Sequence, residues 1–272
     1  MALAMPESSD MHQTAWGALM GELDAWAAAG QVATLWWRDD DAADTGPALE
    51  RLLALRAETA VPLALAVIPA RATADLGDRL NAEAGVVVLQ HGYSHKDFTA
   101  GEGRKIELDD SRPAEYVVAD LAMGGQALER FTYRVPVLVP PWNRIAPHLV
   151  PFLPEIGFRG LSTIGARKRE TPIRGLRQNN VHLDVIDWRG KRTGVARGFM
   201  GANNIISDTL DHLSARRAGD ADPNQAGEAT GLMTHHADMN DEMFGFVAEF
   251  VNRTRAHPAV VWQSATEVFS IS

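Results

Sequence analysis

Short apolar runs rich in β-branched residues return at regular intervals, and they constrain the fold of this chain more than any other feature. Eight such runs lie at about 32–37, 61–68, 85–90, 135–139, 158–163, 181–186, 231–234 and 259–262. Segments with helical patterning separate most of them, at roughly 46–58, 72–82, 113–130, 146–156, 205–217 and 241–256. Alternating strands and helices favour a parallel sheet, and seven or eight such units favour closure into a (β/α) barrel. The sequence therefore predicts an α/β barrel.

The first thirty residues predict a helix ahead of the barrel. Residues 14–29 have one apolar face, formed by Trp16, Leu19, Leu23 and Trp26. Gly30 stands at the expected end of this helix. We expect residues 1–30 to be a helical extension packed on the barrel, and residues 31–272 to be the barrel itself. The polar segment 219–230 is too short for a domain linker, so a single domain is predicted.

The composition narrows the chemistry open to the chain. Its 272 residues include no cysteine, so any metal must be bound by histidine nitrogen and carboxylate oxygen. The net charge of −9 argues against a nucleic-acid partner. No run of about 18 apolar residues is present, and the N-terminus lacks the basic and apolar regions of a signal peptide. We therefore expect a cytoplasmic protein with no membrane partner; the sequence does not predict an oligomeric state.

One stretch of the chain is nevertheless basic. It contains Arg167, Lys168, Arg169, Arg174 and Arg177, followed by Arg189, Lys191, Arg192 and Arg197. Two interpretations remain open at this stage. A run of charges is usually a solvated loop face, but it can also form a rim that attracts an anionic substrate.

Three consecutive acids, Asp39, Asp40 and Asp41, follow directly on the apolar run that ends at Trp37. This places them at the carboxyl end of a strand, where barrel enzymes keep their active sites. Adjacent carboxylates repel one another. A metal ion removes that conflict if it takes one acid as a ligand and leaves a neighbour as a base. The alternative is a helix cap with acids in the first turn.

Two histidines, His91 and His95, follow the next but one strand in the same way. A pair spaced i, i+4 can direct both imidazoles at a common ion. Two imidazoles and one carboxylate make the open three-ligand site that is typical of catalytic zinc. The alternative is a pair of surface histidines in a loop.

Three later segments also follow predicted strands. After 135–139, two prolines form a rigid turn in which the amide of Trp142 can face a developing oxyanion. In the segment 184–188, a carboxylate can orient a histidine or pair with an arginine, and the alternative is that Asp187 caps a turn. After 231–234 come His235 and His236, of which His235 is the better candidate for a general acid.

These five segments resemble, in order, the five motifs of the polysaccharide deacetylases (carbohydrate esterase family four). The resemblance spans about residues 32–265 and implies a distorted (β/α) barrel with about seven parallel strands. It implies Asp39 as the catalytic base and a divalent metal, Zn²⁺ in the first instance, on Asp40, His91 and His95. The site residues that it implies besides these are the backbone amide of Trp142 as oxyanion donor, Asp187 with Trp188 as the fourth motif, and His235 as acid.

The sequence also departs from the pattern of the family. The third acid creates a second register, in which Asp40 is the base and Asp41 the metal ligand. Gly92 stands where the family prefers Ser or Thr, and Val139 replaces the usual Arg of the third motif, for which Arg144 or Arg38 can compensate. The chain thus resembles a divergent member of the superfamily.

The resemblance implies a metal-dependent hydrolase that removes an acetyl group from an N-acetylated carbohydrate. Two alternatives stay open. The same metal site can cleave another small linear or cyclic amide, or the chain can be an inactive relative that only binds metal.

Overall fold

The computed structural model describes residues 7–271 except 100, 102, 190–196 and 221. Within these residues, nine parallel strands form one curved sheet, in the order β6-β5-β4-β3-β2-β1-β10-β7, with β11 paired to the start of β1. The strands are β1 (Ala33–Ala42), β2 (Leu63–Val67), β3 (Val86–His91), β4 (Arg134–Val139), β5 (Gly160–Leu161), β6 (Arg177–Gln178), β7 (Leu183–Asp184), β10 (Thr230–Thr234) and β11 (Val260–Trp262). Two short strands, β8 (Ile186–Asp187) and β9 (Gly198–Phe199), form a separate antiparallel pair.

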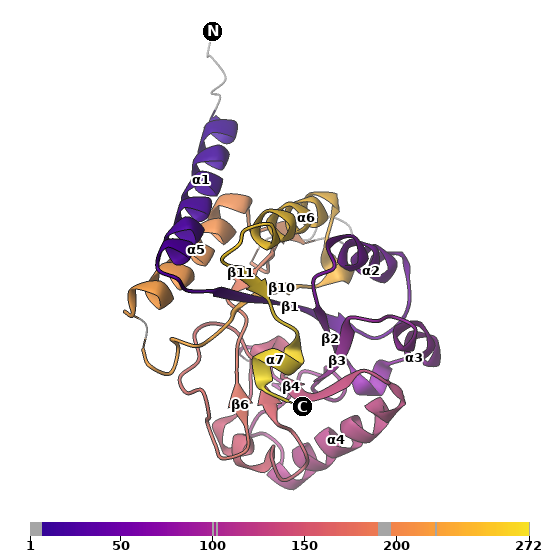
Figure 1. Ribbon diagram of the computed structural model, residues 1–272. Helices are drawn as coiled ribbons and strands as arrows, with labels where there is room; N and C mark the ends of the chain where they lie inside the picture. Colours follow the sequence, from indigo (N-terminus) through magenta and orange to yellow (C-terminus); the bar gives the residue numbers. More distant parts are fainter. Residues whose placement is uncertain (1–6, 100, 102, 190–196, 221, 272) are drawn as a thin grey trace.

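Helices cover the outside of the curved sheet (Figure 1). They are α1 (Glu7–Ala28), α2 (Pro47–Thr59), α3 (Ala74–Asn81), α4 (Ala114–Ala127), α5 (Ala202–Ala218) and α6 (Asp241–Arg255). Local sequence explains several of their starts: Pro47 opens α2, Thr73 accepts a hydrogen bond from Leu76 N at α3, and Asn240 accepts one from Met243 N at α6. The fold is thus an α/β distorted barrel, as the strand–helix alternation predicts.

The two ends of the sheet are joined by a short parallel bridge between Ile164 and Val181. Backbone hydrogen bonds from Gly165 N to Val181 O (2.8 Å) and from Val181 N to Thr163 O (3.0 Å) make this connection. The barrel is therefore distorted, because only this bridge, and not a pair of full strands, links the β5–β6 end of the sheet to the β7 end.

Alternate residues of β1 face the two apolar layers of the protein. Leu35 and Trp37 pack in the layer between the sheet and the outer helices, whereas Trp36 packs in the layer inside the curved sheet. The last helix, α7 (Ala265–Phe269), contributes Phe269 to the inner layer, where its ring meets that of Trp36 edge-on at 5.7 Å. Side chains therefore fill the barrel, and β1 has one inward and one outward face.

Helix α1 packs along α5 by its predicted apolar face. Leu19 and Leu23 are fully buried. Beside them Glu22 forms an ion pair with Arg217 (2.7 Å), and the Arg216 guanidinium lies over the Trp26 ring at 5.3 Å. The division into residues 1–30 and 31–272 stays a prediction, and residues 1–6 lie outside the described part.

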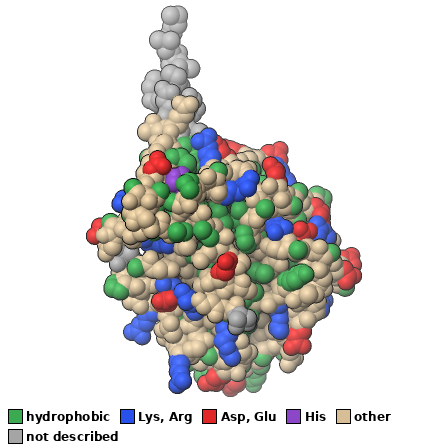
Figure 2. Space-filling view, viewed as in Figure 1, with side chains coloured by type: hydrophobic (Ala, Val, Ile, Leu, Met, Phe, Trp, Pro, Cys, Tyr) green, Lys and Arg blue, Asp and Glu red, His purple; other side chains and the backbone are tan. Residues whose placement is uncertain are grey.

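The predicted elements agree with the observed ones at all eight apolar runs and at most helical segments. The segment predicted as a helix at 146–156 differs, because it contains a 3-10 helix, Pro147–Phe152, with a proline inside it. The short helix α7 was not predicted. In the part of the chain that is described, no helix combines the length and apolarity needed to cross a membrane. Figure 2 shows acidic and basic side chains dispersed over one face. The expected cytoplasmic location stays a prediction.

Candidate metal centre

The three consecutive acids at the end of β1 lie in three different environments. Strand alternation sends Asp39 outward with Trp37 and Asp40 inward with Trp36. The register between β1 and β2 shifts between Asp39 and Ala42, and Asp41 has a positive φ of 72°. This bulge interrupts the alternation, so that Asp40 and Asp41 both line the same cavity, although they are neighbours in the chain.

Asp39 is fully buried and bonded on the outer side of the strand. Its Oδ2 accepts hydrogen bonds from Thr234 Oγ1 (2.6 Å) and from the backbone N–H of His236 (3.0 Å), and its Oδ1 lies 2.5 Å from His236 Nδ1. Burial alone would lower the pKa of His236, but the facing Asp39 carboxylate outweighs it and raises this pKa. Asp39 does not line the cavity, so the geometry gives no support to its predicted role as base.

Asp40 is paired with an arginine two residues earlier on the same inward face. Arg38 donates from Nε to Oδ1 and from Nη2 to Oδ2 of Asp40, both at 2.8 Å. The guanidinium is fully buried and also donates to Ser162 Oγ and Asn143 Oδ1, each at 2.7 Å. Arg38 thus places an arginine directly beside the inward acid and fixes the side chain of Asp40 at the cavity wall.

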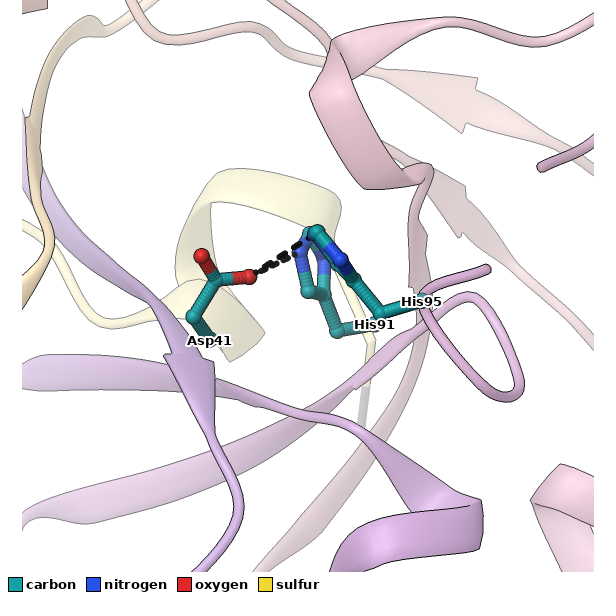
Figure 3. Close-up of side chains that lie close together, drawn as sticks. All are labelled: Asp41, His91 and His95. Atoms are coloured by element: carbon teal, nitrogen blue, oxygen red, sulfur yellow. Dashed lines mark ion pairs between the residues drawn. The ribbon is translucent and has the colours of Figure 1, made fainter. Parts of the chain in front are cut away.

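Asp41 faces the two histidines (Figure 3). Its Oδ1 lies 2.9 Å from His91 Nε2 and 3.1 Å from His95 Nε2, yet it has no partner with hydrogen-bond geometry among the described residues. One donor atom from each of the three side chains lies within 4.8 Å of the other two. Asp40 is not part of this group. The structure therefore brings together His91, His95 and the acid of the second register.

His91 is oriented by the neighbouring strand. Its Nδ1 lies 3.0 Å from the carbonyl oxygen of Val139, at the end of β4. Because a carbonyl only accepts, this contact places a proton on Nδ1 and directs Nε2 toward Asp41. A metal-binding imidazole is commonly fixed in this way.

A buried glutamate holds the loop between the two histidines. Glu107 Oε1 accepts hydrogen bonds from Ser94 N (2.7 Å) and Ser94 Oγ (2.9 Å), and Oε2 accepts one from Tyr93 N (3.2 Å). Gly92 has a φ of 54°, and a Cβ there would collide with Glu107 and lie 2.6 Å from Pro141. This close packing explains why the position that is Ser or Thr in the family is glycine here.

The residues at this site fit a divalent cation. The donor set is one carboxylate oxygen and two imidazole nitrogens, which suits zinc and similar ions. Burial alone would raise the pKa of Asp41, but the contacts with His91 and His95 outweigh it and hold the pKa well below its usual range. Burial alone would lower the pKa of His91, whereas the facing Asp41 raises it. The acid and the imidazoles thus stabilise each other's charged forms across the gap that separates them.

A cavity of about 500 Å³ surrounds this group. Trp142 lies on one side, with its ring 4.3 Å from that of His95. His235 and Trp188 lie on another, with their rings 4.7 Å apart. Asp184 also lines the cavity and accepts a hydrogen bond from Trp188 Nε1 (2.7 Å), and burial raises the pKa of its carboxyl group.

Backbone strain gathers at the same place. Six described residues other than glycine have a positive φ, and four of them line this cavity: Asp41, His95, Trp142 and Asn143. Such conformations cost about 1–3 kcal/mol each and persist only where the surroundings enforce them. Their concentration around one cavity supports it as the candidate functional site.

Of the remaining predicted site residues, His235 lies at the cavity and Asp187 does not. His235 lines the cavity, and its Nδ1 is buried without a hydrogen-bond partner among the described residues. Asp187 accepts a hydrogen bond from Arg189 N (3.0 Å), so it caps a turn, and Asp184 is the acid of that segment that reaches the cavity. The sequence left open whether Arg38 or Arg144 replaces the arginine of the third motif. It assigned no individual role at the site to Asp184 or Glu107.

Most of the basic stretch is not at the site. Arg167 is buried, where it bonds the carbonyls of Gln178 and Asn224, and Arg177 pairs with Glu170 at 2.8 Å. Arg197 alone of the stretch, as far as it is described, lines the cavity. Lys191 and Arg192 lie outside the described residues.

A second group of possible ligands, His182, His212 and Glu228, lies near the opposite ends of the strands. The two imidazoles stack at 3.7 Å with an angle of 29°. His182 Nδ1 already accepts the backbone N–H of Gly231, and His212 Nδ1 lies 2.8 Å from Thr230 Oγ1. Glu228 already accepts the backbone N–H groups of Arg167 and Asn180. This group is therefore a less suitable cation site than the one at Asp41.

Solved structures match the chain over most of its length, whereas no family model and no curated protein matches it. A candidate polysaccharide deacetylase from Mycobacterium smegmatis is 19% identical with a TM-score of 0.65, over 89% of this chain and 90% of that chain. An allantoinase is 13% identical with a TM-score of 0.60, over 88% and 89%. A family 4 acetyl xylan esterase from Clostridium thermocellum, solved with a cobalt ion, is 13% identical with a TM-score of 0.52, over 88% and 91%.

The chain therefore has the fold shared by the polysaccharide deacetylases and the family 4 carbohydrate esterases. The resemblance predicted from the motifs is confirmed at the level of the fold.

Proposed function

We propose that this protein is a metal-dependent hydrolase that removes an acetyl group from an N-acetylated substrate. The observation that carries the proposal is the convergence of Asp41, His91 and His95 in a strained cavity that Asp40 and His235 also line. In this proposal the three converging side chains hold a divalent ion, most simply zinc. Asp40 replaces Asp39 as the base, in keeping with the second register of the acidic run.

When bound, such an ion polarises a carbonyl and lowers the pKa of a water molecule. The other steps belong to the side chains. Asp40, fixed by Arg38, accepts the proton of the attacking water. His235, whose Nδ1 is free of hydrogen bonds among the described residues, donates a proton to the departing amine. The backbone N–H of Trp142 is retained as a donor to the developing oxyanion, with a contribution of about 3–4 kcal/mol.

Proteins of similar fold support two candidate substrate classes. The deacetylases and the acetyl xylan esterase of similar fold support an acetylated carbohydrate, and the cobalt ion of the esterase supports a divalent metal. A second candidate is a cyclic or linear amide, which is favoured by the TM-score of 0.60 to an allantoinase.

The first test is the metal content of the purified protein after incubation with zinc, for the wild type and three single variants. We expect about one equivalent in the wild type and in Asp39→Asn and Asp40→Asn, but loss of the metal in Asp41→Ala. Turnover of acetylated sugars, allantoin and simple acetamides should fall by orders of magnitude in Asp40→Asn, which keeps its metal.

The outcomes separate the two registers. Metal loss in Asp40→Asn, with the metal retained in Asp41→Ala, would restore the first register. A wild type that binds no zinc would overturn the proposal altogether, and a metal-loaded wild type that hydrolyses no amide or ester would leave a binding protein.

A further inference from the structure

The outer part of the cavity that holds Asp41 carries three cationic side chains. Lys105, Arg144 and Arg197 all line it. No carboxylate of the described residues lies within 4.0 Å of the charged group of any of them. By contrast, cations that serve the fold are paired, as Arg79 is with Glu50 and Arg217 with Glu22. The three rim cations are therefore free to meet a ligand.

Two indole rings of the cavity each have a site histidine and one of these cations as neighbours. The Trp142 ring lies 4.3 Å from the His95 ring and 5.9 Å from the Lys105 ammonium. The Trp188 ring lies 4.7 Å from the His235 ring and 5.0 Å from the Arg197 guanidinium. A ligand that contacts either indole is therefore close both to a site histidine and to a cation.

The third cation, Arg144, is hydrogen-bonded to the backbone of the first, Lys105. Its Nη1 donates a hydrogen bond to the carbonyl oxygen of Lys105 (2.8 Å), so both side chains stand on linked backbone segments. Burial, with the charge of the neighbouring Arg104, lowers the pKa of Arg144. An anion beside Arg144 would oppose this lowering, because it would favour the charged guanidinium.

These cations are not needed to balance the acids inside the cavity. Arg38 already pairs with Asp40, and Asp41 faces His91 and His95. The third acid of the cavity, Asp184, accepts hydrogen bonds from Ile186 N and Trp188 Nε1, and burial raises its pKa. The excess of positive charge on the rim is therefore available for a group on the substrate that does not react.

We propose that the substrate of this site is a small amide that bears an anionic group, a carboxylate or a phosphate, on the side away from the reacting carbonyl. The inference rests on the proposed function for the reaction itself. The indoles of Trp142 and Trp188 cover the body of the substrate, and Lys105, Arg144 and Arg197 bind its anionic end.

The test compares three amides on the zinc-loaded full chain: N-acetylglucosamine, N-acetylglucosamine 6-phosphate and N-acetylmuramic acid. We expect kcat/KM to be about tenfold or more higher for at least one of the anionic amides than for the neutral one. This preference should shrink at high salt because the rim is open to solvent. The better of the two anions distinguishes phosphate from carboxylate.

Variants then locate the preference. Arg197→Gln and Lys105→Gln should each reduce the ratio of anionic to neutral kcat/KM severalfold. The matched control is Arg189→Gln, because Arg189 is close to Arg197 in the chain but pairs with Asp187 and does not line the cavity. Its ratio should equal that of the wild type. A ratio near one in the wild type, or one unchanged by both rim variants, overturns the proposal.

A binding experiment keeps this inference separate from the proposed reaction. Calorimetric titration of metal-free protein with the same three amides requires no hydrolysis. Tighter binding of an anionic amide, lost in Arg197→Gln, supports the anion site even if no amide is cleaved. Equal binding of charged and neutral amides, together with hydrolysis of both, would retain the hydrolase and refute the anion site.

Discussion

Replacement of Arg38 by methionine should destabilise the protein strongly, because it strands the carboxylate of Asp40. Both charged groups are essentially buried, with side-chain exposures of 0% and 1%, and two hydrogen bonds of 2.8 Å join them. Removing one member of a buried pair typically costs about 3–5 kcal/mol, because the other charge remains without compensation. We therefore expect Arg38→Met to lower the free energy of unfolding by about that amount.

The double variant Arg38→Met/Asp40→Asn distinguishes a stranded charge from lost packing. Removing both charges of a buried pair is often close to neutral. Some loss should remain, because Arg38 also donates to Ser162 and Asn143. We expect the double variant to be more stable than Arg38→Met alone by about 2 kcal/mol, although it should be inactive.

The assay is urea unfolding of metal-free protein at pH 7, followed by fluorescence and by circular dichroism. Coincident curves justify a two-state fit, and midpoints at equal slope then report stability. The single variant Asp40→Asn, measured beside Arg38→Met and the double variant, completes a double-mutant cycle. If the effects of the two single substitutions simply add in the double variant, the two side chains do not stabilise each other and the reasoning is refuted.

Three further predictions concern the support of the site and the fold. Gly92→Ala should destabilise the protein by about 2–4 kcal/mol in urea unfolding, since its Cβ would collide with Glu107 at a φ of 54°; stability within 0.5 kcal/mol of the wild type would contradict the packing. Glu107→Ala should weaken zinc binding in calorimetry by about 10–100-fold, because the loop that carries His95 loses three hydrogen bonds, whereas Ser94→Ala should lose less. Burial, with the charges of His182 and Arg216, lowers the pKa of His212 to about 2. Because the unfolded state takes up a proton below about pH 6.5 and the folded state does not, stability should fall by about 1.4 kcal/mol per pH unit below that point. The loss between pH 7 and pH 5 should be smaller in His212→Gln, and an equal loss in both proteins would exclude His212 as its source.

Most of the fold could be predicted because the barrel repeats one simple pattern. Most strands are short apolar runs and every candidate-site motif follows one, so strand ends located the candidate site in the sequence. The two-residue strands β6 and β9 are not part of an apolar run and were not predicted. Helix α7 escaped prediction because it has only five residues, Ala265–Phe269. The segment 146–156 looked helical by its apolar spacing, but Pro151 inside it favours the tighter 3-10 turn that is observed.

The roles of Asp39, Asp40 and Asp41 could be predicted only in part from the sequence. Counting from the fully buried Trp36, strand alternation alone places Arg38 and Asp40 on the inner face and Asp39 on the outer one. That signal was present in the sequence. The bulge that also turns Asp41 inward was not, because its positive φ depends on contacts with His91 and His95, which are distant in the chain.

The fourth motif was ambiguous for a similar reason. The chain leaves the barrel after Asp184, and Asp187 enters the antiparallel pair β8–β9, so the acid nearer to Trp188 in sequence is not the one that bonds its indole. Glu107 lies in a connecting segment with no local pattern to distinguish it. Its importance follows only from tertiary contacts with Tyr93 and Ser94.

The bulge in β1 has a consequence for how sequences of this type are compared. A run of three aspartates looks redundant, and an alignment can slide a two-aspartate motif along it without penalty. In this molecule each of the three acids has a different partner. Asp39 contacts His236, Asp40 pairs with Arg38, and Asp41 faces the two site histidines. Within this chain, the arginine two residues earlier on the same face of the strand identifies Asp40 as the inward acid.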